Sequence, residues 1–376
     1  MKNIFLVLSV LFVCACSSIP NSDKGMSPNT LIQKPNFNYK IKSLPRDINI
    51  YFVQGDNTSD LPLAIQGFIA NSYFYNDKIS YKPNIYFSPI KNGKCKTNEQ
   101  KADLIIAFDL SFNSGDTYYQ ECLKTLPKSK TLYVSNHSNA LGFDKNFIIT
   151  REEEKNKLIQ ELINSSTRFI VIDNESTSDK KDIKRLLEEF EKEVLETKTY
   201  NFSYSSQNLF AEILMLNRSE ERIRKISRRL SKNISGVSRT RDDTDSFFLS
   251  VNLNEARSLK PALDYISEKN FNISILNSWS TNTPYKFLDK DLIGSINSDL
   301  PIMMPIKIPE YISEDKRSRE FAIGYDVFEI MLLMNGSVNT NNFIYRGLSG
   351  GIKIDKRQVL RSAYVFKITS QGIEIL

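Results

Sequence analysis

The chain has 376 residues, of which 40% are hydrophobic and 25% charged, and its formal net charge is +6. These proportions are those of an ordinary globular protein, and the length allows one large domain or two of medium size. The modest positive charge suits a nearby anionic surface, but it is too small to require nucleic acid as a partner.

The first sixteen residues have the layout of an export signal. Lys2 gives a positive start, residues 4–13 form an apolar run interrupted only by Ser9, and small residues with Cys14 and Cys16 follow. This order predicts a secretory signal peptide over residues 1–15. The apolar run is shorter than the roughly 20 residues needed to cross a bilayer. We therefore expect export rather than a membrane-spanning helix.

The end of this signal resembles a bacterial lipobox, which implies that Cys16 receives the lipid. An ordinary signal peptide with a chance cysteine is the alternative. Ser17 follows Cys16, and this is similar to the Gram-negative lipoproteins that are sent to the outer membrane. Residues 16–45 are rich in Ser, Asn, Pro and Lys and lack an apolar period. They predict a lipidated flexible tether, with the folded chain, residues 46–376, facing the periplasm.

From about residue 46 onward, the pattern is typical of an α/β fold. Short apolar runs predict buried strands at 48–53, 85–87, 104–108 and 131–134. Helical spacing of apolar residues predicts helices at 61–75 and 116–124. Continuous apolar strands that alternate with helices indicate a mainly parallel sheet covered on both faces.

A second series of the same kind follows. It predicts strands at 169–172, 200–204, 247–251 and 273–276. It predicts helices at 152–163, 179–197 and 208–216, and one that runs from the capping-box pair Asn252 and Glu255 to about 268. Two successive series, each with its own sheet, predict two lobes with a cleft at the strand ends.

Residues 218–232 predict a strongly basic helix with one apolar stripe. The candidate contact residues on it are Arg222, Lys225 and Arg229. One interpretation is a surface that meets an acidic partner, such as a protein patch, anionic lipid headgroups or glycan carboxylates. The other is a solvated outer face, partly balanced by Glu220 and Glu221. Because we expect an exported protein, nucleic acid is not a candidate partner.

Catalytic and metal chemistry find little support in the sequence. His137 is the only histidine, and its surroundings lack a nucleophile elbow and an orienting carboxylate, so an exposed loop histidine is the preferred interpretation. There is no dinucleotide or phosphate-loop motif, and we expect no cofactor and no metal. Cys95 and Cys122 could form one disulfide in an oxidising periplasm, or remain two free thiols.

Residues 247–376 carry an ordered set of matches to one family. They comprise the strand at 247–251 with its following helix, the stretches 280–294, 299–301 and 322–327, and the turn and strand at 345–354. This set resembles the C-terminal domain of the LppC/LpoA lipoproteins, outer-membrane activators of class A penicillin-binding proteins. The resemblance implies an α/β, two-lobed fold like the type I periplasmic binding proteins, each lobe a mainly parallel sheet flanked by helices.

The resemblance also implies a division and a role. Lobe one would hold about 46–147 and 300–337, and lobe two about 148–299 and 338–376, with three crossovers between them. The implied function is non-catalytic: binding a peptidoglycan synthase and raising its activity. Long family members carry a helical-repeat region before this domain, whereas here a tether of about 30 residues precedes it. Fully stretched, such a tether spans at most ~100 Å.

The fold implies a cleft, which makes a tethered solute receptor the rival hypothesis. The strand-end loops would bring six side chains to this cleft: Asp109, Ser111, Asn136, Ser278, Trp279 and Tyr325. Asp109 could face the amine of an amino acid or a muropeptide. Alternatively, Asp109 caps a helix or a turn, and Trp279 is a contact anchor or packs in the core.

Overall fold

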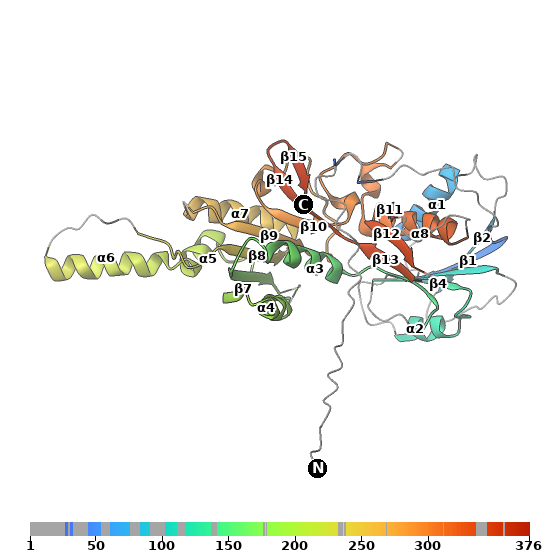
Figure 1. The fold of residues 1–376 in the computed structure, drawn as a ribbon, viewed down its shortest axis with the longest axis horizontal. Helices are drawn as coiled ribbons and strands as arrows, with labels where there is room; N and C mark the ends of the chain where they lie inside the picture. Colours follow the sequence, from blue (N-terminus) through green and yellow to red (C-terminus); the bar gives the residue numbers. More distant parts are fainter. Residues whose placement is uncertain are drawn as a thin grey trace, which may run out of the picture.

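The computed structural model of the chain forms two α/β lobes side by side, with one helix projecting from the end of the second (Figure 1). It describes residues 27–28, 31–32, 44–53, 61–75, 83–90, 102–110, 117–136, 141–175, 177, 179–231, 236, 238–267, 269–310, 312–335, 344–355 and 358–376. Each lobe contains a mainly parallel sheet flanked by helices, so the predicted fold class is confirmed.

The first sheet has eight strands in the order β11-β12-β13-β5-β4-β3-β1-β2. Their bounds are β1 (Asp47–Val53), β2 (Asn84–Ile90), β3 (Leu104–Asp109), β4 (Thr131–Ser135), β5 (Lys145–Ile148), β11 (Ile344–Arg346), β12 (Gly351–Asp355) and β13 (Gln358–Ser362). Strands β1 to β5 and β13 are parallel, and β11 and β12 are antiparallel. Alternate residues of β1 point to opposite faces, and because both faces are covered, the five residues from Ile48 to Phe52 are all buried.

Helices cover both faces of this sheet. On one face lie α1 (Leu63–Tyr75) and α8 (Arg319–Asn335), whose apolar residues pack in one cluster with Ile48 and Ile50 of β1. On the other lies α2 (Thr117–Lys124), which contributes Cys122 and Leu123 to a cluster with Tyr51. The side chains on the two faces of β1 therefore belong to two separate hydrophobic clusters.

Helices α1 and α8 cross at two glycines. A Cβ at Gly324 would lie 1.7 Å from the Ala64 carbonyl oxygen, and one at Gly67 would lie 2.1 Å from the Phe321 carbonyl oxygen. The backbones therefore approach too closely for any side chain at either position. This contact joins the first lobe to a helix that is more than 240 residues away in the sequence.

The second sheet has seven strands in the order β15-β14-β10-β9-β8-β6-β7. Their bounds are β6 (Arg168–Asn174), β7 (Glu193–Tyr200), β8 (Ser246–Val251), β9 (Asn272–Asn277), β10 (Ile296–Asp299), β14 (Tyr364–Thr369) and β15 (Gly372–Ile375). Only β14 and β15 run antiparallel to their neighbours. Three short 3₁₀ helices lie at η2 (Lys290–Leu292), η3 (Pro301–Met303) and η4 (Glu314–Lys316).

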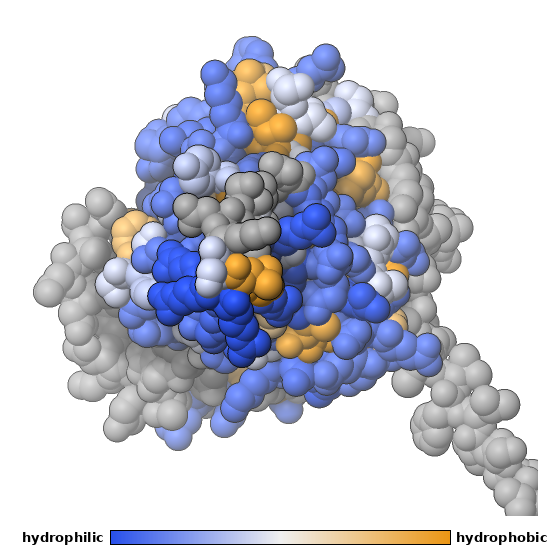
Figure 2. Space-filling view, turned by 90° about the vertical axis from the view of Figure 1, so that its left-hand side faces the viewer, coloured by the Kyte–Doolittle hydropathy of each residue, from blue (hydrophilic) through white to orange (hydrophobic). Residues whose placement is uncertain are grey.

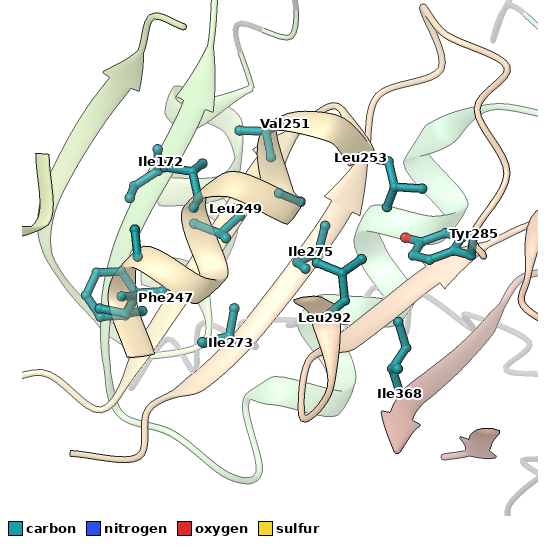
Figure 3. Close-up of a cluster of buried hydrophobic side chains, with 14 of the residues drawn as sticks. Ile172, Phe247, Leu249, Val251, Leu253, Ile273, Ile275, Tyr285, Leu292 and Ile368 are labelled. Atoms are coloured by element: carbon teal, nitrogen blue, oxygen red, sulfur yellow. The ribbon is translucent and has the colours of Figure 1, made fainter. Parts of the chain in front are cut away.

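Helices also cover both faces of the second sheet. One face packs against α3 (Arg151–Leu162) and α4 (Lys180–Glu189). The other packs against α5 (Ser206–Ile213) and α7 (Leu253–Ile266), where Figure 3 shows Phe247, Leu249 and Ile275 facing the helix. The predicted capping box is present: the Asn252 side chain accepts from the Glu255 N–H, and the Glu255 carboxylate accepts from the Asn252 N–H.

One predicted element is wrong. The expected helix at 179–197 ends at Glu189, and 193–200 forms the edge strand β7, which replaces the strand expected at 200–204. Glu191 adopts a left-handed backbone conformation with φ of 59°, which ends the helix. Phe190, directly after the last residue of α4, is 44% exposed. The helical spacing of apolar residues after Glu189 is therefore coincidental, because those residues belong to the turn and to β7.

The predicted division of the C-terminal part also needs correction. Residues 338–376 were expected in lobe two, but β11, β12 and β13 belong to the first sheet, since β13 pairs in parallel with β5. Of the strands after residue 338, only β14 and β15 belong to the second sheet. The chain therefore passes between the sheets at 149–150, at Leu300 and at Ala363. The last of these crossovers is a single residue between two strands.

Candidate functional site: the junction between the lobes and a basic helix

Two buried ion pairs join the lobes next to these crossovers. The first links Arg319 of α8 to Asp299 at the end of β10, and both side chains are 0% exposed. Arg319 Nε donates to Asp299 Oδ1 over 3.0 Å and Nη2 donates to Oδ2 over 2.7 Å, while Nη1 donates to the Thr281 carbonyl over 2.8 Å. Asn277 donates to the same carboxylate. Its neighbours thus satisfy the desolvated carboxylate at each oxygen.

The second pair links Arg361 of β13 to Glu154 of α3. Arg361 Nε also donates to the Ser349 carbonyl over 2.7 Å. Burial raises the pKa of Glu154 above its ordinary value, and the charge of Arg361 opposes this rise. Because β13 belongs to the first sheet and α3 packs on the second, this pair connects the lobes beside the third crossover.

Asp326 of α8 holds the turn that leads into β12. Its carboxylate accepts from the Leu348 N–H over 3.0 Å and from the Ser349 N–H and hydroxyl, both over 2.6 Å. Burial raises the pKa of Asp326 to about 7. A Cβ at Gly347 would lie 2.4 Å from Asp326 Oδ2, so this position needs glycine. The turn between β11 and β12 therefore packs directly against a buried carboxylate.

Arg151, directly after the first crossover, fills the carboxyl ends of two strands in the second sheet. Its guanidinium donates to the carbonyls of Asn277 and Leu276, to the Ser250 hydroxyl and to Asp179. Burial lowers the pKa of Arg151, and Asp179 opposes this shift. In related α/β folds, ligands lie at this edge. Here one of the chain's own side chains occupies the strand ends.

The predicted cleft residues in the first lobe are engaged internally. Asp109 is 1% exposed and accepts a 2.6 Å hydrogen bond from the Tyr133 hydroxyl. Burial, together with this bond, raises the pKa of Tyr133 above its ordinary value. The Asn136 N–H donates to the Asp109 carbonyl over 3.3 Å, so the structure brings these two residues together. Ser111 lies outside the described residues.

The other predicted cleft residues lie where the lobes meet. Ser278 and Ser280 share a 2.8 Å hydrogen bond between their hydroxyls. Trp279 is partly buried against two apolar clusters, one of which contains Tyr325, and the Arg319 guanidinium lies 5.5 Å from the centroid of its ring. Tyr325 is 2% exposed, so its side chain belongs to this apolar cluster.

The remaining sequence candidates are divided between described and undescribed residues. Cys122 is buried and disulfide-bonded, while Cys95, Cys16 and His137 lie outside the described residues. Within the described part of the chain, no group of His, Cys, Asp and Glu side chains is arranged to hold a metal ion. No helix there is long and apolar enough to cross a bilayer.

The basic contact residues lie on α6 (Leu216–Leu230), which buries none of its side chains. Arg222, Lys225 and Arg229 are all exposed. Both ends of the helix are marked by residues with left-handed backbone conformation, Met215 with φ of 57° and Ser231 with φ of 49°. Helix α6 projects away from the rest of the second lobe, as Figure 1 shows.

Sequence reasoning missed the ion pairs at the junction. In the sequence, Asp299 and Asp326 lie within stretches that resemble the family, and no local pattern marks Arg319, Arg361 or Glu154. The available signal was a charge inside an apolar stretch: Asp326 and Glu329 interrupt the otherwise apolar core of α8. Their partners, however, cannot be inferred from spacing.

Comparisons with known proteins agree with this fold. Residues 188–364 match the family model described as LppC putative lipoprotein. No curated protein sequence matches the chain. Full-length LpoA from Haemophilus influenzae superposes with a TM-score of 0.56 at 12% identity, covering 90% of this chain and 60% of that one. The chain thus spans about three fifths of that protein.

Two further solved structures cover nearly all of their own length. The C-domain of Haemophilus influenzae LpoA, described as a regulator of PBP1A, has a TM-score of 0.54 at 12% identity over 88% of this chain and 99% of that one. A putative branched-chain amino acid ABC transporter protein from Rhodospirillum rubrum has a TM-score of 0.56 at 11% identity, covering 89% and 100%. At these identities the similarities establish the fold alone.

Proposed function

We propose that this chain, whose residues 188–364 match the LppC lipoprotein family model, binds a class A penicillin-binding protein and raises its activity. The observation that carries this proposal is the family match over residues 188–364, which runs from α4 to the start of β14 and includes most of the second sheet and α8. The LpoA C-domain, a regulator of PBP1A, shares the fold across almost its whole length.

A non-catalytic role agrees with how the buried charges are used. Asp299, Glu154 and Asp326 each accept hydrogen bonds from partners inside the fold. A catalytic acid or base needs to reach the proton it transfers. These three carboxylates instead bond to groups at the junction between the lobes. This use of the buried charges supports a protein that acts by binding.

The test measures glycan polymerisation and peptide cross-linking by the organism's own class A penicillin-binding proteins. We expect saturable stimulation by the full chain and direct binding with the same concentration dependence. A branched-chain amino acid binding protein of the same fold is the control. It shows whether the fold alone, without the surface residues of this chain, stimulates the synthase. Absence of both binding and stimulation would contradict the proposal.

We further propose that the protein is anchored by lipid on Cys16 to the outer membrane and faces the periplasm. The support is the lipobox-like sequence around Cys16 and the serine after it. Labelling with radioactive palmitate and membrane fractionation test this: Cys16→Ser is expected to lose label and membrane association. The matched control is Cys14→Ser, which removes a cysteine on the signal-peptide side and is expected to keep both.

A receptor for an amino acid or a muropeptide is the second candidate, favoured by the similarity to the Rhodospirillum rubrum transporter protein. Asp109 would hold the amine, but its carboxylate is buried and bonded to Tyr133. Calorimetry with leucine, isoleucine and a muropeptide panel decides between the two. Tight binding that Asp109→Asn abolishes would favour the receptor over the activator.

A further inference from the structure

Helix α6 is a projecting arm with a high net positive charge for its length. It carries six basic residues, Arg218, Arg222, Arg224, Lys225, Arg228 and Arg229, against two acidic ones, Glu220 and Glu221. Its formal charge is therefore +4, compared with +6 for the whole chain. None of its side chains is buried. The lobe's own core does not account for this composition.

The charges of α6 are arranged unevenly around the helix. Glu220 pairs with Arg224 and Glu221 with Lys225, both at i,i+4 spacing, so two of the six basic side chains are partly neutralised. Arg218, Arg222 and Arg229 follow one line along the helix at spacings of four and seven residues. Among the described residues these three arginines form no ion pair. Their guanidinium groups are therefore available to an anionic surface.

Exposed apolar side chains lie directly beside this line of arginines. Ile226 is 43% exposed and lies one turn after Arg222, at i+4, and Leu230 is 59% exposed and lies one turn after Ile226. Ile223 of the same stripe is half-buried near Gly236, and the Arg239 N–H bonds the Ser219 hydroxyl over 2.9 Å. Figure 2 looks onto this end of the molecule and shows hydrophobic surface beside strongly hydrophilic surface.

We propose that α6 binds an anionic lipid surface. Arginines on the flank attract the phosphate groups, and Ile226 and Leu230 enter the boundary between headgroups and acyl chains. A convex arm suits a deformable lipid surface, which can close around both groups, whereas an acidic protein would need a groove shaped to the helix. This contact is independent of the proposed action on a synthase.

The experiment is co-sedimentation with phosphatidylcholine vesicles that contain or lack phosphatidylglycerol. Every protein carries Cys16→Ser to remove the predicted lipid and is otherwise the full chain, so residues 1–26 contribute equally throughout. We compare the parent with R222Q/R229Q and with I226Q/L230Q. The matched control is K184Q/R185Q on α4, which removes two exposed positive charges from another helix of the same lobe. Circular dichroism checks that α6 remains folded.

We expect the parent to bind the anionic vesicles only, and less at higher salt. Each arginine removed from α6 is expected to lower the partition coefficient about fivefold, and I226Q/L230Q to lower it as well, while K184Q/R185Q binds like the parent. Equal binding to both vesicle types, or no effect of the α6 variants, would overturn the proposal. It would equally be overturned if these variants lost synthase binding but kept vesicle binding, which would identify an acidic protein instead.

Discussion

The Arg319 guanidinium makes a two-point ion pair with the Asp299 carboxylate across the boundary between the lobes, and neither side chain is exposed. Asp299 is the last residue of β10 in the second sheet, whereas Arg319 is the first residue of α8, which packs on the first sheet. Together with Arg361 and Glu154, this pair places charge at two of the three crossovers. The lobes are thus joined by more than chain connectivity.

Arg319→Met should destabilise the protein by about 3–5 kcal/mol, because it leaves the Asp299 carboxylate buried without its cation. Urea unfolding measures this as a lower free energy of unfolding. The double variant R319M/D299L should cost less than R319M alone, since both charges are then removed. Lys307→Ala, from an exposed pair with Glu310, is the control and should change nothing measurable. A loss under 1 kcal/mol for R319M would contradict a structural role for the pair.

Gly324→Ala should destabilise the protein by about 1–3 kcal/mol or more, because the new methyl group would overlap the Ala64 carbonyl and push α1 away from α8. Thermal unfolding provides the measurement. Gly236→Ala is the matched control: it meets only the Ile223 side chain, at 3.3 Å, and should have little effect. If both variants unfold at the same temperature, the helices do not cross as described.

The pH dependence of stability should reveal the buried carboxyl of Glu329. Burial raises its pKa from 4.5 to about 7. The folded chain therefore holds this proton to higher pH than the unfolded chain, and the contribution to stability falls as pH rises from about 4.5 to about 7. Glu329→Gln keeps an acceptor for the Tyr75 hydroxyl and should flatten the fall.

Urea unfolding of both proteins at a series of pH values across this range tests this prediction. The quantity to compare is the difference in free energy of unfolding between the parent and Glu329→Gln, because other groups titrate in both. The variant should gain stability relative to the parent as pH rises. A difference that does not change with pH would mean that Glu329 titrates normally.

Tyr133→Phe should cost about 1–3 kcal/mol, because Asp109 would lose the hydroxyl that donates to its buried carboxylate. Chemical unfolding measures the loss, and Tyr265→Phe, at a side chain that is 80% exposed, is the control. If Asp109 instead serves a ligand, Tyr133→Phe would change ligand affinity in calorimetry while leaving stability nearly unchanged.

The regular elements were largely predictable from the sequence because each depends on local patterns. The buried strands β3, β4, β6, β8 and β9 are short, mainly apolar runs, and the Asn252 capping box marks the start of α7. The helix at 179–197 was overextended because apolar spacing carries no information about the left-handed turn at Glu191.

The pairing of distant segments was not predictable in the same way. Nothing in residues 344–362 indicates that β13 pairs with β5 rather than with the second sheet. Arg361 and Glu154 are 207 positions apart, so no local spacing predicts their contact. The six cleft candidates were chosen as strand-end residues, and this position alone does not show that Asp109 would be enclosed by Tyr133.

The single-residue crossover at Ala363 has a mechanical consequence. A receptor that signals by closing needs crossovers that twist at little cost. Here the chain leaves one sheet and enters the other within one residue, next to Arg361, whose guanidinium is already committed to both lobes. Rotating one lobe against the other would pull that guanidinium from a buried carboxylate. We therefore expect the two lobes to resist rotation against each other.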